Sequence, residues 1–218
     1  MPNGTLSRRL GAMSVAVAAG LLSSASWADP GAQTMRFSVM RDGEQIGTTT
    51  VQVRHDGQAM STEVKTHVQV KIAYVTVYRY DQTETEQWNN GKLQAMSAVT
   101  DENGTVHHVS ARADGNALAV DTDGKVNRVD PSLMPVSLWN PALMRCTKAI
   151  DPQNGNVTPV SVVDKGREDV LVGGHPTPAH HYAIATSFPQ DVWYDDHHQL
   201  IQVELRGSDG SKIHYQPG

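Results

Sequence analysis

Cysteine is almost absent from this sequence, because Cys146 is its single thiol. One cysteine makes no intramolecular disulfide, so the fold must be held by a hydrophobic core. After Ala28 no apolar run approaches the roughly 20 residues of a transmembrane helix. Basic residues are also outnumbered, and the formal net charge of −5 disfavours nucleic acid or an anionic membrane surface as a partner. These absences predict a soluble protein without a stable membrane span.

Familiar catalytic motifs are missing as well. The sequence contains no Gly-x-Ser-x-Gly elbow, no His-Glu-x-x-His helix and no phosphate-binding glycine loop. Glu84 and Glu86 lie two residues apart on one face of an expected strand, which fits a glycosidase-like pair or a solvated edge. Catalytic groups can also be assembled in space, where spacing does not reveal them. We therefore expect a protein that is not an enzyme and requires no cofactor, with an unrecognised hydrolase as an alternative.

The N-terminus has the three parts of a secretory signal. Arg8 and Arg9 are the basic start, and Leu10 to Leu22 is an apolar core that is short for a bilayer span. Ser26 and Ala28 supply the small side chains that signal peptidase requires. We predict cleavage after Ala28, a signal peptide over 1–28 and one β domain over 29–218 in the periplasm. Export by the general route and by the twin-arginine route both stay open.

Turn dipeptides recur along most of the chain. Their second residue is glycine, which accepts a positive φ without steric cost. Eight pairs have this form: Asp42-Gly43, Asp56-Gly57, Asn90-Gly91, Asn103-Gly104, Asp114-Gly115, Asp123-Gly124, Asn154-Gly155 and Asp209-Gly210. Between the turns, side chains alternate in polarity, most clearly from Val64 to Ile72. This spacing predicts about twelve antiparallel strands joined by hairpins.

One segment interrupts the alternation. Pro131 to Ile150 contains three prolines, which do not serve a central ladder. Asn140 before Pro141 suits the N-cap of a short helix. We expect a proline-rich crossing segment over one end of an all-β fold, a single strongly curved antiparallel sheet that forms a barrel or half-barrel. A two-sheet sandwich is the alternative.

Several short sequence segments resemble those of a known family. They are Tyr78-Arg79-Tyr80, Glu86-Gln87-Trp88, Gly91-Lys92-Leu93, Pro135-Val136-Ser137-Leu138-Trp139-Asn140, His181-Tyr182, Asp191-Val192-Trp193-Tyr194-Asp195 and Asp209-Gly210-Ser211-Lys212-Ile213-His214-Tyr215. Over nearly all of the mature chain they resemble an uncharacterised family of exported proteobacterial proteins, the domain of unknown function 6134. The resemblance implies an exported β protein and supplies no activity. The architecture is more distantly similar to curved-sheet periplasmic carriers of lipids or lipoproteins, and fold alone does not fix function.

Large aromatic side chains are the candidates for ligand binding. Tyr80, Trp88, Trp139, Trp193 and Tyr194 are spread over strands and the crossing segment. A curled sheet that gathers them would line a cavity for a lipid-like ligand. A packed core would bury the same residues, and alternation does not separate a filled interior from a hollow one.

Paired histidines give a metal hypothesis as the second functional class. His180, His181, His197 and His198 are the candidate ligands, with Asp195 or Asp196 beside the second pair. Adjacent strand residues face opposite sides, so chelation would need a neighbouring strand.

Cys146 is flanked by Arg145 and Lys148, which would activate a thiol, but we favour a structural, half-buried cysteine. The leading hypothesis is a periplasmic binder of an apolar or amphipathic molecule, or of an envelope partner protein.

Overall fold

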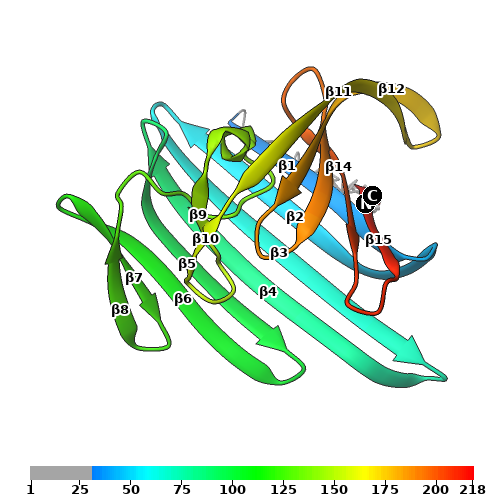
Figure 1. The fold of residues 1–218 in the computed structure, drawn as a ribbon, viewed down its shortest axis with the longest axis horizontal. Coiled ribbons are helices and arrows are strands. Elements are labelled where there is room, and N and C mark those ends of the chain that lie inside the picture. Colours follow the sequence, from blue (N-terminus) through cyan, green and yellow to red (C-terminus); the bar gives the residue numbers. More distant parts are fainter. Residues whose placement is uncertain (1–30) are drawn as a thin grey trace, which may run out of the picture.

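The computed structural model describes residues 31–218, so the predicted signal peptide lies outside the described residues. Eight strands follow one another along the chain: β1 (Ala32–Arg41), β2 (Glu44–Asp56), β3 (Ala59–Ile72), β4 (Val75–Asn89), β5 (Lys92–Glu102), β6 (Thr105–Asp114), β7 (Ala117–Thr122) and β8 (Lys125–Val129). Each pairs with the next in antiparallel fashion (Figure 1).

A second antiparallel run follows the crossing segment. Its strands are β11 (Ser161–Val172), β12 (His175–Ala185), β13 (Pro189–Tyr194), β14 (Leu200–Arg206) and β15 (Lys212–Pro217). β15 pairs with β1, with Tyr215 opposite Val39, and this pairing joins the two runs into one 13-stranded sheet. Over residues 31–218 the strand order begins at β11 and ends at β8, so the sheet stays open. The predicted half-barrel is confirmed, and the sandwich alternative is not.

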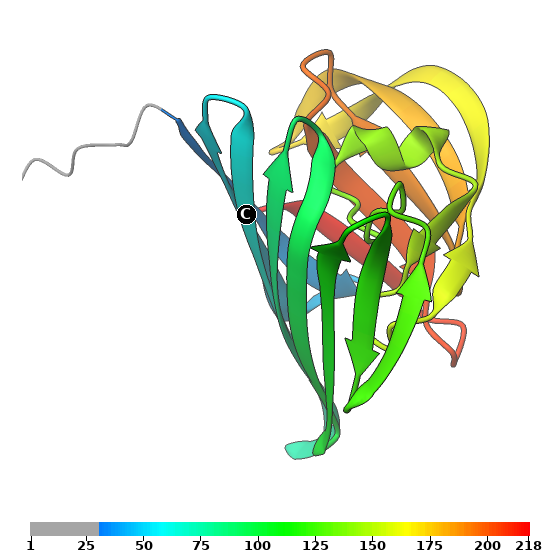
Figure 2. The same ribbon diagram turned by 90° about the vertical axis from the view of Figure 1, so that its left-hand side faces the viewer.

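Figure 2 shows how strongly this sheet curls. The curl follows from the right-handed twist that each added pair of strands contributes. The described residues contain fifteen strands, more than the twelve expected. The estimate is low partly because β9 (Lys148–Ile150) and β10 (Val157–Pro159), which form a separate two-stranded sheet, are too short to show alternation.

All eight predicted turn dipeptides lie where strands end. Asn90 and Gly91 are typical, with φ of 51° and 70° between β4 and β5. The turn between β3 and β4 was missed, because Ala73 and Tyr74 adopt φ of 48° and 68° without a glycine. An Asx-Gly dipeptide is therefore a sufficient signal for a turn in this chain but not a necessary one.

The crossing segment enters the concave side of the sheet. It contains the 3₁₀ helix η1 (Pro141–Arg145), and the Asn140 side chain accepts a hydrogen bond from the Ala142 amide, as an N-cap does. Leu143 and Ile150 are fully buried within the same apolar cluster as strand residues of the sheet. The segment therefore fills much of the interior instead of covering only one end.

One apolar core connects the two runs of strands. It includes Phe37 of β1, Leu118 of β7 and Val192 of β13, together with Leu143 of η1. Among residues 31–218, no helix has the length and apolar character needed to cross a membrane, and η1 has only five residues.

Candidate binding site

Two carboxyl groups lie inside the half-barrel. β4 alternates between the two faces of the sheet, and its inward positions include Glu84, Glu86 and Trp88. Glu84 is 4% exposed and Glu86 is 1% exposed. The neighbouring strand β5 places Ala98 opposite Glu84 and Met96 opposite Glu86. The solvated-edge interpretation of this pair was wrong, because the crossing segment and the curl of the sheet cover the face on which the pair lies.

Glu86 is held by donors from two parts of the chain. The Trp88 indole donates from Nε1 to Oε2 of Glu86 over 2.8 Å. The Ser137 hydroxyl, from the crossing segment, donates to Oε1 of the same carboxyl group. These contacts tie the crossing segment to β4 and orient the Glu86 side chain.

Three buried polar atoms near this pair have no well-aligned hydrogen-bond partner among the described residues, although Glu84 and Trp139 lie close enough to Glu86 to lower its pKa. They are Oε1 of Glu84, the Thr62 hydroxyl and Nε1 of Trp139. Thr62 lies directly opposite Glu86 on β3. The Trp139 ring packs edge-on against Trp88, with centroids 6.5 Å apart. Buried polar groups in native proteins are nearly always paired, so three unpaired atoms in one cluster point to a ligand or to ordered water.

Burial raises the pKa of both carboxyl groups. Burial raises the pKa of Glu84 well above its ordinary value, and the negative charge of Glu86 raises it further. Burial also raises the pKa of Glu86, against hydrogen bonds from Ser137 and Trp88 that lower it. Glu84 is therefore the stronger proton holder of the pair, and Glu86 is the better site for a negative charge.

Tyrosines extend this polar patch along the same face. Tyr80 lies four residues before Glu84 on β4, and burial raises its pKa, with smaller contributions from Tyr215, Tyr78 and Glu84. Burial, aided by Glu102, raises the pKa of Tyr78 to about 12. These phenols stay neutral at physiological pH and act as hydrogen-bonding groups. The patch thus combines aromatic surface with polar atoms.

The predicted ligand-binding aromatics divide between the two faces. Tyr80, Trp88 and Trp139 belong to the inner patch described above. Tyr194 is also internal, and its hydroxyl donates to the Leu138 carbonyl over 2.7 Å. Trp193 stands on the other face, because neighbouring strand residues alternate. It stacks on His181 with centroids 4.2 Å apart.

The histidine candidates are also separated. His181 contacts Glu168 through Nδ1 at 3.0 Å and Asp191 through Nε2 at 2.7 Å. His180 stacks on Tyr182 instead and contacts Asp164 at 2.7 Å.

His197 and His198 lie exposed in the turn between β13 and β14, as the sequence predicts. The side chain of Asp195 accepts from the His197 amide and so caps this turn. No group of three or more metal-ligating side chains is found within residues 31–218. The metal hypothesis stays a prediction without a supporting cluster.

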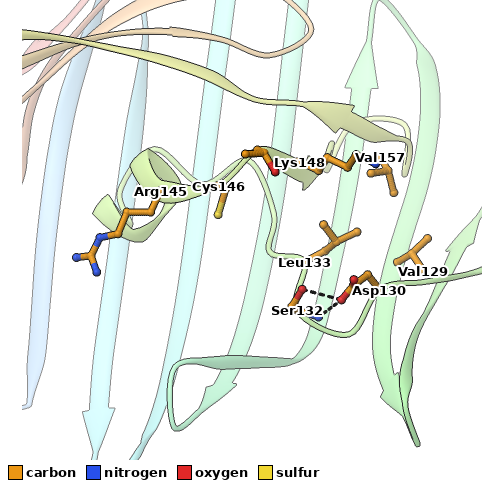
Figure 3. Close-up of a pocket in the computed structure, with 9 residues that line it drawn as sticks. Val129, Asp130, Ser132, Leu133, Arg145, Cys146, Lys148 and Val157 are labelled. Carbon is orange, nitrogen blue, oxygen red and sulfur yellow. Dashed lines mark hydrogen bonds between the residues drawn. The ribbon is translucent and has the colours of Figure 1, made fainter.

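An open pocket lies beside the crossing segment (Figure 3). It has a volume of about 460 Å³, and Val129, Leu133, Cys146 and Val157 are among its lining residues. Arg145 extends away from the other labelled side chains. Burial raises the pKa of the Cys146 thiol, which agrees with the structural, half-buried cysteine that we favoured. None of the aromatic residues predicted to bind a ligand lines this pocket.

Sequence reasoning did not select Thr62, Glu84, Glu86 or Ser137 as binding residues. The available signal was the phase of β4, in which Glu84 and Glu86 alternate in step with Trp88. Their common face is readable from sequence, but its burial depends on distant strands and on the crossing segment.

Comparison with known proteins gives a fold and a family. The chain resembles a crystal structure titled as a β-barrel-like protein of domain of unknown function DUF1849 from Brucella abortus. The TM-score is 0.57 at 11% identity, and the alignment covers 86% of this chain and 94% of the other. No curated protein matches the sequence. A family model described as Domain of unknown function (DUF6134) matches residues 37–218. That match spans most of the sequence, so the chain belongs to this uncharacterised family, as the sequence phrases implied.

Proposed function

We propose that the protein is a non-enzymatic periplasmic binder of a small amphipathic, lipid-like molecule. The ligand's polar end meets the inner cluster of Thr62, Glu84 and Trp139, and its apolar part lies against the aromatic and aliphatic side chains around it. The observation that carries this proposal is the set of three buried polar atoms without well-aligned partners, beside the buried carboxyl pair.

The chemistry of the three atoms restricts the ligand. The Trp139 indole only donates, whereas the protonated carboxyl group of Glu84 and the Thr62 hydroxyl each donate and accept. A ligand hydroxyl or amide group also donates and accepts, so it pairs with more than one of them. Each buried polar group left unpaired costs about 1–3 kcal/mol. A ligand that pairs these groups recovers part of that cost.

The surroundings supply the apolar half of the recognition. Trp88, Met96, Ala98 and Leu143 are buried in the core cluster. Ala98 and Met96 lie opposite Glu84 and Glu86, and Trp88 lies two residues after Glu86 on β4. Mostly apolar and aromatic walls with a few placed polar groups are typical of small-molecule sites. The filled interior requires the ligand to displace part of the crossing segment, which is joined to β4 through Ser137 and Glu86.

Native mass spectrometry of the protein as purified from cells, without added ligand or metal, tests the proposal. We expect a small organic adduct that is lost on denaturation. A double variant, Thr62→Val with Trp139→Phe, removes two polar partners and keeps an apolar side chain at one position and an aromatic ring at the other, so the adduct fraction should fall at least about tenfold. Trp193→Phe, on the opposite face, is the matched control and should keep the adduct.

Three results would count against this proposal. Bare wild-type protein would favour a filled core and a protein partner. A metal-sized adduct would favour the histidine hypothesis. An adduct lost in Trp193→Phe but kept in the double variant would move the site to the outer face.

A further inference from the structure

The hairpin of β3 and β4 extends beyond the strands on both sides of it. β2 pairs with β3 only as far as the contact of Gly47 with Val68. β5 pairs with β4 only from the contact of Glu102 with Tyr80. Residues 69–79 therefore form a two-stranded projection, the β3–β4 tip, which reaches past its neighbours at the lower right of Figure 1.

The β3–β4 tip exposes large apolar side chains. Tyr74 is 100% exposed, Val75 63%, Ile72 60% and Val77 52%. Ile72 and Val75 form a cross-strand pair, and Tyr74 stands in the turn that joins them. Single exposed apolar residues are ordinary, but four at the end of one projection mark an interaction site.

The backbone of this turn is an unfavourable one for its residues. Ala73 and Tyr74 adopt φ of 48° and 68°, in the left-handed region that L-residues with a Cβ disfavour. The eight Asx-Gly turns elsewhere in the chain place only aspartate, asparagine or glycine at such positions. Tyr74 gains no burial in return, since its side chain is fully exposed. A large aromatic side chain at a strained, solvent-facing position indicates a role outside the chain itself.

Charge on the β3–β4 tip differs from that of the whole chain. The chain carries a formal charge of −5, yet no aspartate or glutamate occurs from Val64 to Tyr80. Lys71 is exposed and forms no ion pair within the described residues. Its ammonium group lies one residue from Ile72, where it can reach a phosphate while the apolar side chains are buried.

We infer that the β3–β4 tip inserts into the interfacial layer of a phospholipid bilayer. The apolar groups occupy both strands and the turn, so they are presented end-on, which suits a fluid surface more than a shaped protein groove. Tyrosine is favoured at the membrane interface, where its ring is buried and its hydroxyl stays hydrated. The net negative charge of the whole chain disfavours an anionic membrane surface as a partner, but residues 69–79 of the tip include no aspartate or glutamate. This docking is independent of ligand binding inside the half-barrel.

Vesicle co-sedimentation of the purified protein tests the inference. Vesicles of phosphatidylethanolamine and phosphatidylglycerol should carry the wild-type protein into the pellet. The double variant Ala73→Asn with Tyr74→Gly installs a favourable turn and removes the aromatic side chain. We expect its vesicle affinity to fall roughly tenfold, while its urea midpoint rises, so the loss is not caused by unfolding.

Two further variants separate the contributions. Lys71→Gln should weaken binding about fivefold, as expected for one basic residue at an anionic surface. Leu171→Ser is the matched control, because Leu171 is 68% exposed on another hairpin that carries Glu168 and Asp169. Its vesicle binding should equal that of the wild type.

A label at the tip provides an independent readout. In a Cys146→Ser background, Tyr74→Cys carries a polarity-sensitive dye whose emission should shift to the blue when vesicles are added. The same dye at Leu171→Cys should not shift. Wild-type protein that stays in the supernatant, or an Ala73→Asn/Tyr74→Gly variant that binds as well as the wild type, would overturn the inference.

Discussion

Glu84 and Glu86 place two carboxyl groups in the interior of the protein, where a negative charge is unfavourable. A buried carboxyl group is stable chiefly in its neutral form, because burial removes the hydration of the charge. Burial raises the pKa of both residues, and Glu84 has the stronger rise. The folded protein therefore holds a proton near Glu84 that the unfolded chain releases above its ordinary pKa of 4.5.

A pH dependence of stability follows from that proton. Above pH 4.5 the folded state binds more protons than the unfolded state, so the free energy of unfolding falls as pH rises, by up to roughly 1.4 kcal/mol per pH unit. Glu84→Gln should remove most of this slope. Urea unfolding at a series of pH values between about 5 and 8, which lie above the ordinary pKa of a glutamate, measures it. The exposed Glu44→Gln variant is the control. An unchanged slope in Glu84→Gln would show that Glu84 is ionised in the folded state.

At the scale of elements, the crossing segment contributes a large part of the interior. Leu143 and Ile150 have no exposed surface, and Ser137 joins the segment to Glu86. A proline-rich stretch without regular pairing is usually a surface connection. Here it supplies side chains to the concave face, which an open half-barrel would otherwise leave in contact with water.

Leu143→Ala tests this role. Removal of a fully buried leucine side chain leaves a cavity, so we expect a loss of about 2–5 kcal/mol in the free energy of unfolding, measured by urea denaturation. Arg145→Ala, at an exposed position of the same 3₁₀ helix, should change stability by less than about 0.5 kcal/mol. Equal effects of the two variants would mean that η1 does not pack against the sheet in solution.

For the molecule as a whole, the important pairing is that of β15 with β1. It joins the last strand to the first described strand and merges two runs into one sheet with one apolar core. The two edge strands, β8 and β11, remain apart.

We expect residues 29–218 to unfold as one domain. The core cluster contains residues of β1, β7 and β13, so neither run of strands buries its own apolar face without the other. Far-ultraviolet circular dichroism and tryptophan fluorescence should then report coincident urea transitions. Two separated transitions would contradict the single-domain prediction.

The sequence by itself determined the local structure. Asx-Gly dipeptides specify tight turns because glycine tolerates positive φ, and alternating polarity specifies strands because side chains alternate across a pleat. The exception, Ala73-Tyr74, shows the limit of that signal, because neither residue is typical of a tight turn and the sequence therefore did not predict one there. The Asn140 cap before η1 was also predictable, because a cap depends on adjacent residues.

Only the tertiary structure decided which faces are buried and what meets inside. Alternation assigns Trp193 and Tyr194 to opposite faces, but it does not place Tyr194 beside Leu138 of the crossing segment. From sequence, Glu84 and Glu86 fit a glycosidase-like pair or a solvated edge, and only the distant segment that covers them shows that they are buried. Contacts between residues far apart in sequence depend on the curvature of the whole sheet and on the pairing of β15 with β1. Local propensities do not encode either, so the candidate binding site became visible only in the folded molecule.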